Sequence, residues 1–239
     1  RIIFAGTPDF ARVALERLHA SGFDIALVLT QPDRPAGRGL KLQASPVKQF
    51  ALEAGIPVLQ PEKLKDEAFL EALRGYRADL QIVVAFRMLP EVVWAMPALG
   101  TFNLHASLLP QYRGAAPIHR AVMNGDRTTG VTTFFLQHEI DTGDLLLQES
   151  IEIGPEEDTG SVHDRLMELG ARAVCETVDA IRTGNVHPIP QPEGVWKPAP
   201  KLFRENTRID WTRPAAELHD FIRGLSPFPA AWTELEDPD

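Results

Sequence analysis

Cysteine is almost absent from this sequence, since Cys175 is the single one among 239 residues. The chain therefore has no internal disulfide, and a thiolate zinc site, which needs several cysteine or histidine ligands, is not expected. Long hydrophobic runs are also lacking, because the longest apolar stretches, such as Ile82–Phe86, have the length of a strand rather than of a membrane span. We expect a protein of a reducing, cytoplasmic compartment.

Positive charge is in deficit, with 24 lysines and arginines against 33 aspartates and glutamates and a net charge of −9. This balance argues against a general nucleic-acid coat or a membrane-surface protein, although it leaves room for a local basic patch. Residues 6–11 read GTPDFA and lack the glycines of a dinucleotide-binding turn. There is no G-x-S-x-G elbow, no Walker A loop and no histidine spacing suited to a metal. We therefore expect neither a nicotinamide cofactor nor a metal.

What the sequence does have is a regular alternation of apolar strands and amphipathic helices. It predicts strands at 1–6, 25–30, 56–59, 80–86 and 100–105, and two more at 131–136 and 145–153 that form an antiparallel extension. Helices are expected over 8–20, 46–54, 65–74, 115–123 and 161–183. A capping box at Ser161 opens the last helix and Gly184 ends it. Strands alternating with helices indicate βαβ units and an α/β fold with a parallel sheet.

Composition also suggests where the domains divide. Residues 1–184 form the alternating region and are interpreted as one catalytic domain. Residues 185–203 form a linker, because five prolines fall between 185 and 200. Residues 204–239 begin a further, incomplete domain with a helix expected at 215–224.

Asn103 and His105 are two positions apart on one predicted strand, so both side chains leave from the same face. They lie near the carboxyl end of the strand, where open α/β sheets bind ligands. A neutral amide and an imidazole that carries a proton near neutral pH can together hold a developing oxyanion. Asp141, in the turn 140–144, can face the same sheet end and orient the histidine. A hydrogen-bonded interior pair and ordinary turn chemistry remain the simpler interpretations.

Two loops carry further candidates. Residues 107–117 follow the Asn103 strand directly, and their apolar shelf beside polar donors is typical of the wall of a heteroaromatic pocket, or of a packed connection. Residues 32–48 carry four cations against Asp33. On an acidic chain this loop favours a polyanionic partner, although a solvated surface loop would explain it as well.

Together these features resemble the folate-dependent formyltransferases. The resemblance is carried by Asn103-x-His105-x-Ser107-Leu108-Leu109-Pro110, followed by Asp141-Thr142-Gly143-Asp144. Residues 4–11, 31–48, 113–117 and 208–211 point further to the members that act on methionyl-tRNA, and the likeness runs over essentially the whole chain.

The resemblance implies a Rossmann-like, mostly parallel sheet flanked by helices, then a linker and the start of a C-terminal β-barrel domain. It implies transfer of the formyl group of 10-formyltetrahydrofolate to the α-amino group of methionyl-tRNA for translation initiation, with no metal, membrane or obligate protein partner. A free amine is already a nucleophile, so no serine or cysteine intermediate is needed. The implied catalytic residues are Asn103, His105 and Asp141. The implied folate contacts are Phe86, Arg87, Met88, Leu89, Ser107, Leu108, Leu109 and Pro110, and the implied tRNA contacts are Arg34, Arg38, Lys41 and Lys48.

Other members of this group remain open as alternatives. Glycinamide ribonucleotide formyltransferase shares the catalytic set but has no reason to carry the basic loop or the C-terminal start. Sugar-nucleotide formyltransferases and the hydrolase domain of formyltetrahydrofolate dehydrogenase share the Ser-Leu-Leu-Pro and Asp-Thr-Gly-Asp motifs. A folate- or RNA-binding module without turnover is a different class, which the intact Asn/His/Asp set disfavours.

Overall fold

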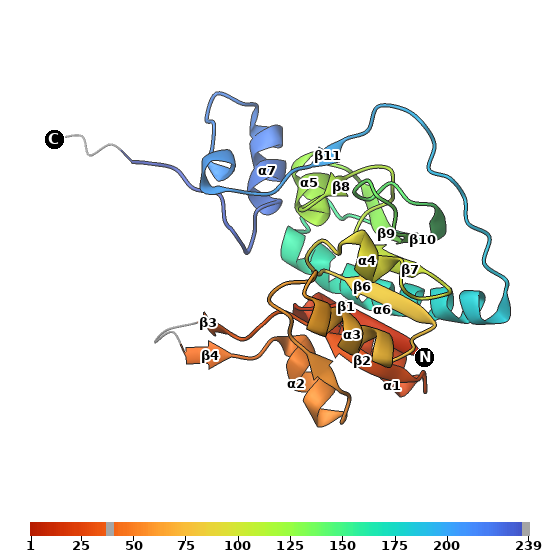
Figure 1. Cartoon of the computed structure of the whole chain (residues 1–239). Helices are drawn as coiled ribbons and strands as arrows, with labels where there is room; N and C mark the ends of the chain where they lie inside the picture. Colours follow the sequence, from red (N-terminus) through yellow and green to blue (C-terminus); the bar gives the residue numbers. More distant parts are fainter. Residues whose placement is uncertain (37–40, 236–239) are drawn as a thin grey trace.

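A seven-stranded sheet forms the centre of the molecule in the computed structural model, which describes residues 1–36 and 41–235 (Figure 1). The strands lie in the order β10-β9-β7-β6-β1-β2-β5. They are β1 (Ile2–Gly6), β2 (Ile25–Leu29), β5 (Val58–Leu59), β6 (Leu80–Val84), β7 (Thr101–His105), β9 (Thr128–Phe135) and β10 (Leu145–Glu152). The strands from β7 to β5 are parallel, whereas β9 and β10 are antiparallel to their neighbours. The predicted mixed, mostly parallel sheet is confirmed, although the third strand is shorter than the predicted 56–59.

Both faces of the sheet are covered by helices. Along β1, Ile2 and Phe4 pack into the core on one face, and Ile3 and Ala5 pack into the core on the other. The first core lies under α1 (Asp9–Ala20), α2 (Pro46–Glu53), α5 (Pro117–Met123) and α6 (Thr159–Thr183), and the second under α3 (Glu67–Gly75) and α4 (Glu91–Trp94). Because apolar side chains are needed on both faces, β1 and β2 are continuous hydrophobic runs.

Side-chain caps fix where several helices begin. The hydroxyl of Ser45 accepts the backbone N–H of Lys48 at 3.1 Å ahead of α2. At α6 the predicted start is wrong: Asp158 Oδ1 accepts the N–H of Ser161 at 2.9 Å, so Asp158 is the N-cap and the helix begins at Thr159. An aspartate three residues upstream supplies the cap that the sequence pattern assigned to Ser161. Gly184, at φ 72°, ends the helix as expected.

The chain after α6 runs along one side of the molecule and returns over its top (Figure 1). There β11 (Pro198–Ala199) pairs in parallel with β8 (Arg113–Gly114), a pairing that the interpretation as an extended linker missed. A 3-10 helix (Arg204–Thr207) and α7 (Ala215–Arg223) follow. Met123 of α5, Phe221 of α7 and Leu225 form a small core that joins this C-terminal segment to α5.

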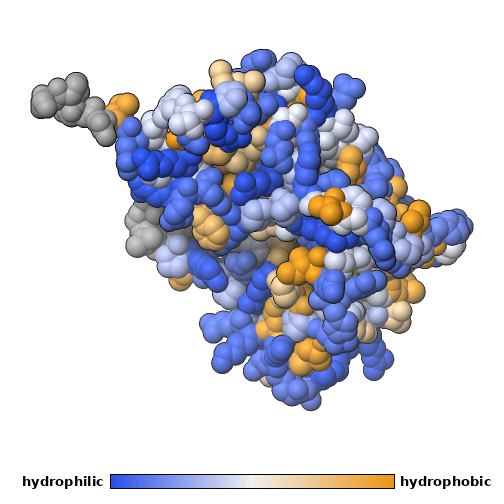
Figure 2. Space-filling view, turned by 90° about the horizontal axis from the view of Figure 1, so that it is seen from above, coloured by the Kyte–Doolittle hydropathy of each residue, from blue (hydrophilic) through white to orange (hydrophobic). Residues whose placement is uncertain are grey.

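The basic segment 32–48 contains a short antiparallel hairpin rather than a simple loop. Its strands are β3 (Arg34–Ala36) and β4 (Lys41–Gln43), and the hairpin projects from the body of the molecule (Figure 1). Arg38 lies outside the described residues, and so does the side chain of Lys41. The face seen in Figure 2 carries hydrophobic residues in small patches among hydrophilic ones. In the described ranges, no helix combines the length and apolar character needed to cross a bilayer.

Candidate active site

A cavity of about 700 Å³ opens at the carboxyl ends of β1, β6 and β7. From β1 the chain proceeds outward through β2 to β5, and then returns to place β6 on the other side of β1. Open α/β sheets bind their ligands at such a change of direction. Pro8 after β1, Ala85 after β6 and Ala106 after β7 all line the cavity.

The structure brings the three predicted catalytic residues to this cavity. Asn103, His105 and Asp141 all line it. The side chains of His105 and Asp141 are 7% and 12% exposed, and His105 Nδ1 lies 3.9 Å from Asp141 Oδ2. This separation is longer than a hydrogen bond but short enough for direct electrostatic interaction. The juxtaposition matches the shared strand face and the turn position expected from the sequence; the roles of the three residues stay a prediction.

The two ring nitrogens of His105 have different surroundings. Nε2 lies 2.8 Å from the backbone carbonyl oxygen of Tyr112. A carbonyl only accepts hydrogen bonds, so Nε2 is the nitrogen that carries a hydrogen. Nδ1 is therefore the atom that can take up or release a proton, and it faces the Asp141 carboxylate.

Tyr112 is held firmly in place to present that carbonyl. Its backbone has φ 62°, a left-handed conformation that costs a residue with a large side chain about 1–3 kcal/mol. Its side chain is buried, and its hydroxyl donates to Asp126 Oδ2 at 2.5 Å. Burial raises the pKa of this hydroxyl, so it stays a donor at neutral pH. Lys197 Nζ bonds the other Asp126 oxygen at 2.7 Å.

Asp141 is fixed through both its side chain and its main chain. Its Oδ2 accepts the N–H of Gly114 at 2.9 Å. Gly114 has φ 124°, and a Cβ there would stand 2.5 Å from the carbonyl oxygen of Ala199, so glycine is required. Asp141 itself has φ 56°. The Nε2 of Gln191 donates to the carbonyl oxygens of Asp141 and Gly143 at 2.8 and 2.9 Å. At about 0.5–1.5 kcal/mol each, these bonds are comparable to the cost of the left-handed backbone.

Gly143 allows the Asp141 turn to pack against β9. A Cβ at position 143 would fall 1.6 Å from the carbonyl oxygen of Phe135. The glycine of the Asp-Thr-Gly-Asp motif is therefore required by close backbone approach, and this lets Asp141 face the cavity.

The segment after β6 lines the cavity as the folate prediction requires. Phe86, Arg87, Met88 and Leu89 are all in the lining. Met88 is 72% exposed, whereas Leu89 is buried. The guanidinium of Arg87 donates to the carbonyl oxygens of Pro61 and Glu62, so it holds the segment down. Burial lowers the pKa of Arg87 from its ordinary value.

The segment after β7 carries the other predicted folate contacts, Ser107, Leu108, Leu109 and Pro110. The cavity lining includes Ala106 just before it, and the folate role of these four residues stays a prediction. The polar groups of this segment bond inward. The hydroxyl of Thr132 donates to the carbonyl oxygen of Ser107 at 2.6 Å and accepts the N–H of Leu109 at 3.1 Å. Gln148 Nε2 donates to the carbonyl oxygen of Leu109 at 2.8 Å. These bonds attach the backbone of Ser107 and Leu109 to β9 and β10. Polar residues inside β9 and β10 were the only sequence signal for this attachment.

The structure describes two of the four predicted tRNA contacts fully. Arg34 is exposed on β3. Lys48 Nζ pairs with Asp33 Oδ2 at 2.6 Å, with its side chain 18% exposed, and Gln60 Nε2 bonds the other Asp33 oxygen at 2.7 Å. Lys48 is therefore committed to an internal pair, whereas Arg34 projects into solvent.

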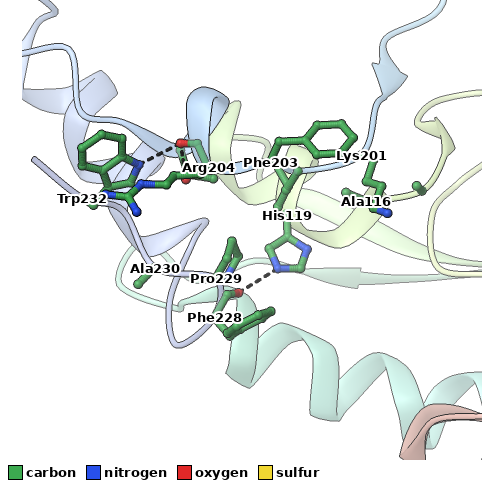
Figure 3. A pocket seen from close by; sticks show the side chains of 12 residues that line it. Ala116, His119, Lys201, Phe203, Arg204, Phe228, Pro229, Ala230 and Trp232 are labelled. Carbon is green, nitrogen blue, oxygen red and sulfur yellow. Dashed lines mark hydrogen bonds between the residues drawn. The ribbon is translucent and has the colours of Figure 1, made fainter. Parts of the chain in front are cut away.

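A second cavity of about 550 Å³ adjoins the first and was not expected from the sequence (Figure 3). The two share Ala115, Ala116 and His119 in their linings. Its other wall comes from the C-terminal segment, with Lys201, Phe203, Arg204, Phe228 and Trp232. His119 Nε2 lies 3.0 Å from the carbonyl oxygen of Phe228. Burial lowers the pKa of His119, so the ring is neutral at pH 7.

Comparison with protein-family models identifies the family of this chain. Residues 1–178 match the model of the formyl transferases, and residues 201–239 match the model of the formyl transferase C-terminal domain. The chain belongs to the formyl transferase family.

Two similar relatives in the family are both named methionyl-tRNA formyltransferase. The chain is 63% identical to methionyl-tRNA formyltransferase of Bacteroides fragilis over 243 residues, covering all of this chain and 75% of the relative. It is 54% identical to methionyl-tRNA formyltransferase of Porphyromonas gingivalis, with the same coverage.

Solved structures of other proteins share the fold at low sequence identity. An N-formyltransferase from Helicobacter canadensis, in complex with folinic acid and dTDP-3-aminofucose, matches 93% of this chain and 79% of its own with a TM-score of 0.71 and 18% identity. HypX from Aquifex aeolicus, in complex with tetrahydrofolic acid, matches 98% of this chain and 36% of its own with a TM-score of 0.67 and 21% identity. Their likeness supports the same α/β architecture.

Proposed function

We propose that this protein transfers the formyl group of 10-formyltetrahydrofolate to the α-amino group of methionyl-tRNA, the reaction that prepares the initiator for translation. The observation that carries the proposal is the convergence of Asn103, His105 and Asp141 in one cavity, in a chain 63% identical to a methionyl-tRNA formyltransferase. The proposal covers the catalytic roles of these three residues.

The chemistry of the three residues suits transfer to an amine. When bound, 10-formyltetrahydrofolate supplies the formyl group. The Asn103 amide can donate a hydrogen bond to the formyl oxygen as negative charge develops there. His105 can hold a second proton at Nδ1, and Asp141 lies next to that atom to orient it and to relay the proton that the amine loses. The residues would thus stabilise charge and move a proton. The amine would form a new bond to the formyl carbon, the bond from that carbon to the folate nitrogen would break, and the proton that the amine loses would pass to that nitrogen, so that tetrahydrofolate leaves.

The cavity walls divide into a donor side and an acceptor side. Phe86, Leu89 and Trp94 offer apolar surface for a flat heterocycle, which fits the pteridine of a folate. On the other side, beyond His119, the second cavity presents Lys201 and Arg204 with aromatic residues (Figure 3). Cations with aromatic side chains suit the 3′ end of a nucleic acid.

The hairpin β3–β4 is proposed as a further tRNA contact. Arg34 supports it, and Arg38 and Lys41 belong to the same segment by sequence. Lys48 contributes less, because its ammonium is already paired with Asp33. In each case phosphate neutralisation would supply the binding energy.

A substrate panel tests the proposal. The purified protein is incubated with 10-formyltetrahydrofolate and with methionyl-tRNA, a dTDP-amino sugar, glycinamide ribonucleotide or water alone. We expect formyl transfer to methionyl-tRNA and to none of the others. Faster transfer to the amino sugar would identify a sugar N-formyltransferase instead, and release of formate in water alone would identify a hydrolase.

A further inference from the structure

The linker between the two matched regions passes beside the Asp141 turn and the loop that follows β7. The backbone of Ile189 exchanges two hydrogen bonds with Leu145, at 2.8 and 2.9 Å. The carbonyl oxygen of Lys197 accepts the N–H of Tyr112 at 2.7 Å, and that of Ala199 accepts the N–H of Ala115 at 2.8 Å. Residues 189–199 are therefore attached both beside the Asp141 turn and to the loop that holds His105.

Gln191 is the side chain through which this linker reaches the turn itself. Its Nε2 donates to the carbonyl oxygens of both Asp141 and Gly143. Its Oε1 accepts two hydrogen bonds from the guanidinium of Arg113, at 3.1 and 2.5 Å. The half-buried amide thus uses both its donor and its acceptor ends, and it spans 50 residues of sequence to do so.

We propose that Gln191 is a positioning residue for Asp141, and through it for the proton at His105 Nδ1. The inference rests on the proposed function, because it concerns the same catalytic set. Gly114 and Gln191 act on one residue: Gly114 holds the carboxylate of Asp141, and Gln191 holds its carbonyl oxygen. Arg113, which hydrogen-bonds Gln191, is adjacent to Gly114 in the chain. The groups that hold the Asp141 carboxylate and that anchor Gln191 therefore come from neighbouring residues of β8.

The direction of each hydrogen bond makes glutamine specific at this position. Two backbone carbonyls require a donor, and the Arg113 guanidinium requires an acceptor. A primary amide supplies both at one site. Glutamate would keep the bonds from Arg113 but would place a carboxylate oxygen against the two carbonyls. Methionine would fill similar space and make none of these bonds.

The test compares Gln191→Met and Gln191→Glu with the wild-type chain, using 10-formyltetrahydrofolate and methionyl-tRNA. We expect kcat to fall about tenfold to 10²-fold in both variants, because small displacements of a reacting group have effects of this size. KM for both substrates should change little. The pH–rate profile should change shape, because the Asp141–His105 pair is displaced. The other titratable groups lining the cavity are Arg87, His119, His138, Glu139 and His163, none of which hydrogen-bonds Gln191 in the described structure.

Gln111→Met is the matched control. Gln111 Oε1 accepts the N–H of Lys197 at 3.1 Å, so this variant weakens the same linker without touching the Asp141 turn. It should keep the wild-type kcat and pH profile. If Gln191→Met does not fold, Arg113→Met carries the test, because it releases Gln191 while leaving its side chain in place.

The outcomes separate the possible failures. Unchanged kcat and pH profile in folded Gln191→Met, or a loss that only follows the folded fraction at every pH, would overturn the positioning role. An equal loss in Gln111→Met would assign the effect to the linker as a whole. A wild-type chain without methionyl-tRNA formylation would instead overturn the proposed function.

Discussion

The segments after β6 and after β7 make an instructive pair. Phe86–Leu89 and Ser107–Pro110 each follow a parallel strand, each leave the same edge of the sheet, and each were expected to contact the folate. Only the first lines the cavity. Residues 107–110 turn inward and bond to Thr132 and Gln148 of the antiparallel strands.

The difference follows from where the backbone hydrogen bonds of each segment go. After β6, Ala85 adopts φ 46° and the chain lies across the cavity, held from behind by the Arg87 guanidinium. After β7 the chain meets β9, whose buried Thr132 satisfies a carbonyl and an N–H of the loop. The two segments thus differ in the partners of their backbone groups, and composition does not specify those partners.

The largest effect is expected on β7, the strand that carries Asn103 and His105. His105→Ala and Asn103→Ala should each lower the rate of formyl transfer about 10²–10³-fold, the usual cost of losing one donor to a developing oxyanion. Circular dichroism should show that both variants remain folded. His187→Ala, an exposed histidine of the linker, is the control and should retain full activity. Near-normal turnover of either catalytic variant would remove that residue from the site.

For the segment 107–110, we predict that Thr132→Val destabilises the protein without altering folate recognition. The substitution keeps the shape of the side chain but leaves buried groups of Ser107 and Leu109 without partners, at about 1–3 kcal/mol for each group. Thermal unfolding measures the loss, and KM for the folate in the folded fraction should stay constant. Thr128→Val, at an exposed position of the same strand, should unfold like the wild type. A raised folate KM with wild-type stability would give residues 107–110 a ligand role after all.

For the segment Phe86–Leu89, Met88→Ala should have the opposite effect: weaker folate binding with unchanged stability. Met88 is exposed at the cavity, so truncation removes apolar surface from the folate without opening the core. We expect KM for 10-formyltetrahydrofolate to rise about threefold to tenfold, since partial burial of one such side chain contributes about 1 kcal/mol. The melting temperature should not change. Val195→Ala, in the exposed linker, provides the comparison for an apolar truncation away from the cavity.

The smallest effect concerns the hairpin, where two cations have different partners. Arg34→Gln should lower the slope of log tRNA affinity against log salt concentration by about one unit or less, as expected for one phosphate contact. Lys48→Gln should change the slope less, because Lys48 is already paired with Asp33. Measurements of methionyl-tRNA affinity at several salt concentrations decide this. Equal slopes for the wild type and Arg34→Gln would argue against the hairpin as a tRNA contact.

The sheet and its helices could be predicted because burial imposes a period on the sequence. β1 is apolar at every position since each face meets a core, and α6 repeats apolar residues such as Val162, Leu166 and Leu169 along one side. The shared face of Asn103 and His105 followed from strand alternation, whereas Asp141 was added by its turn motif together with the family resemblance. These are local signals that survive in the sequence.

The features that could not be predicted depend on contacts between residues far apart in the sequence. The pairing of β8 with β11 involves two residues on each side, too few to show a period. Gln191 reaches a turn 50 residues away, and nothing near it in the sequence marks that contact. Asp158 and Ser161 are both good caps, and the choice between them follows from the geometry of the incoming chain. The inward direction of residues 107–110 depends likewise on Thr132 in another strand.

The most direct test of the account is a crystal structure of this protein with tetrahydrofolate bound. The account predicts the pteridine against Phe86–Leu89, with the nitrogen that carries the formyl group in the donor directed toward Asn103 and His105. A folate found in the second cavity, beside Phe203 and Trp232, would contradict this account.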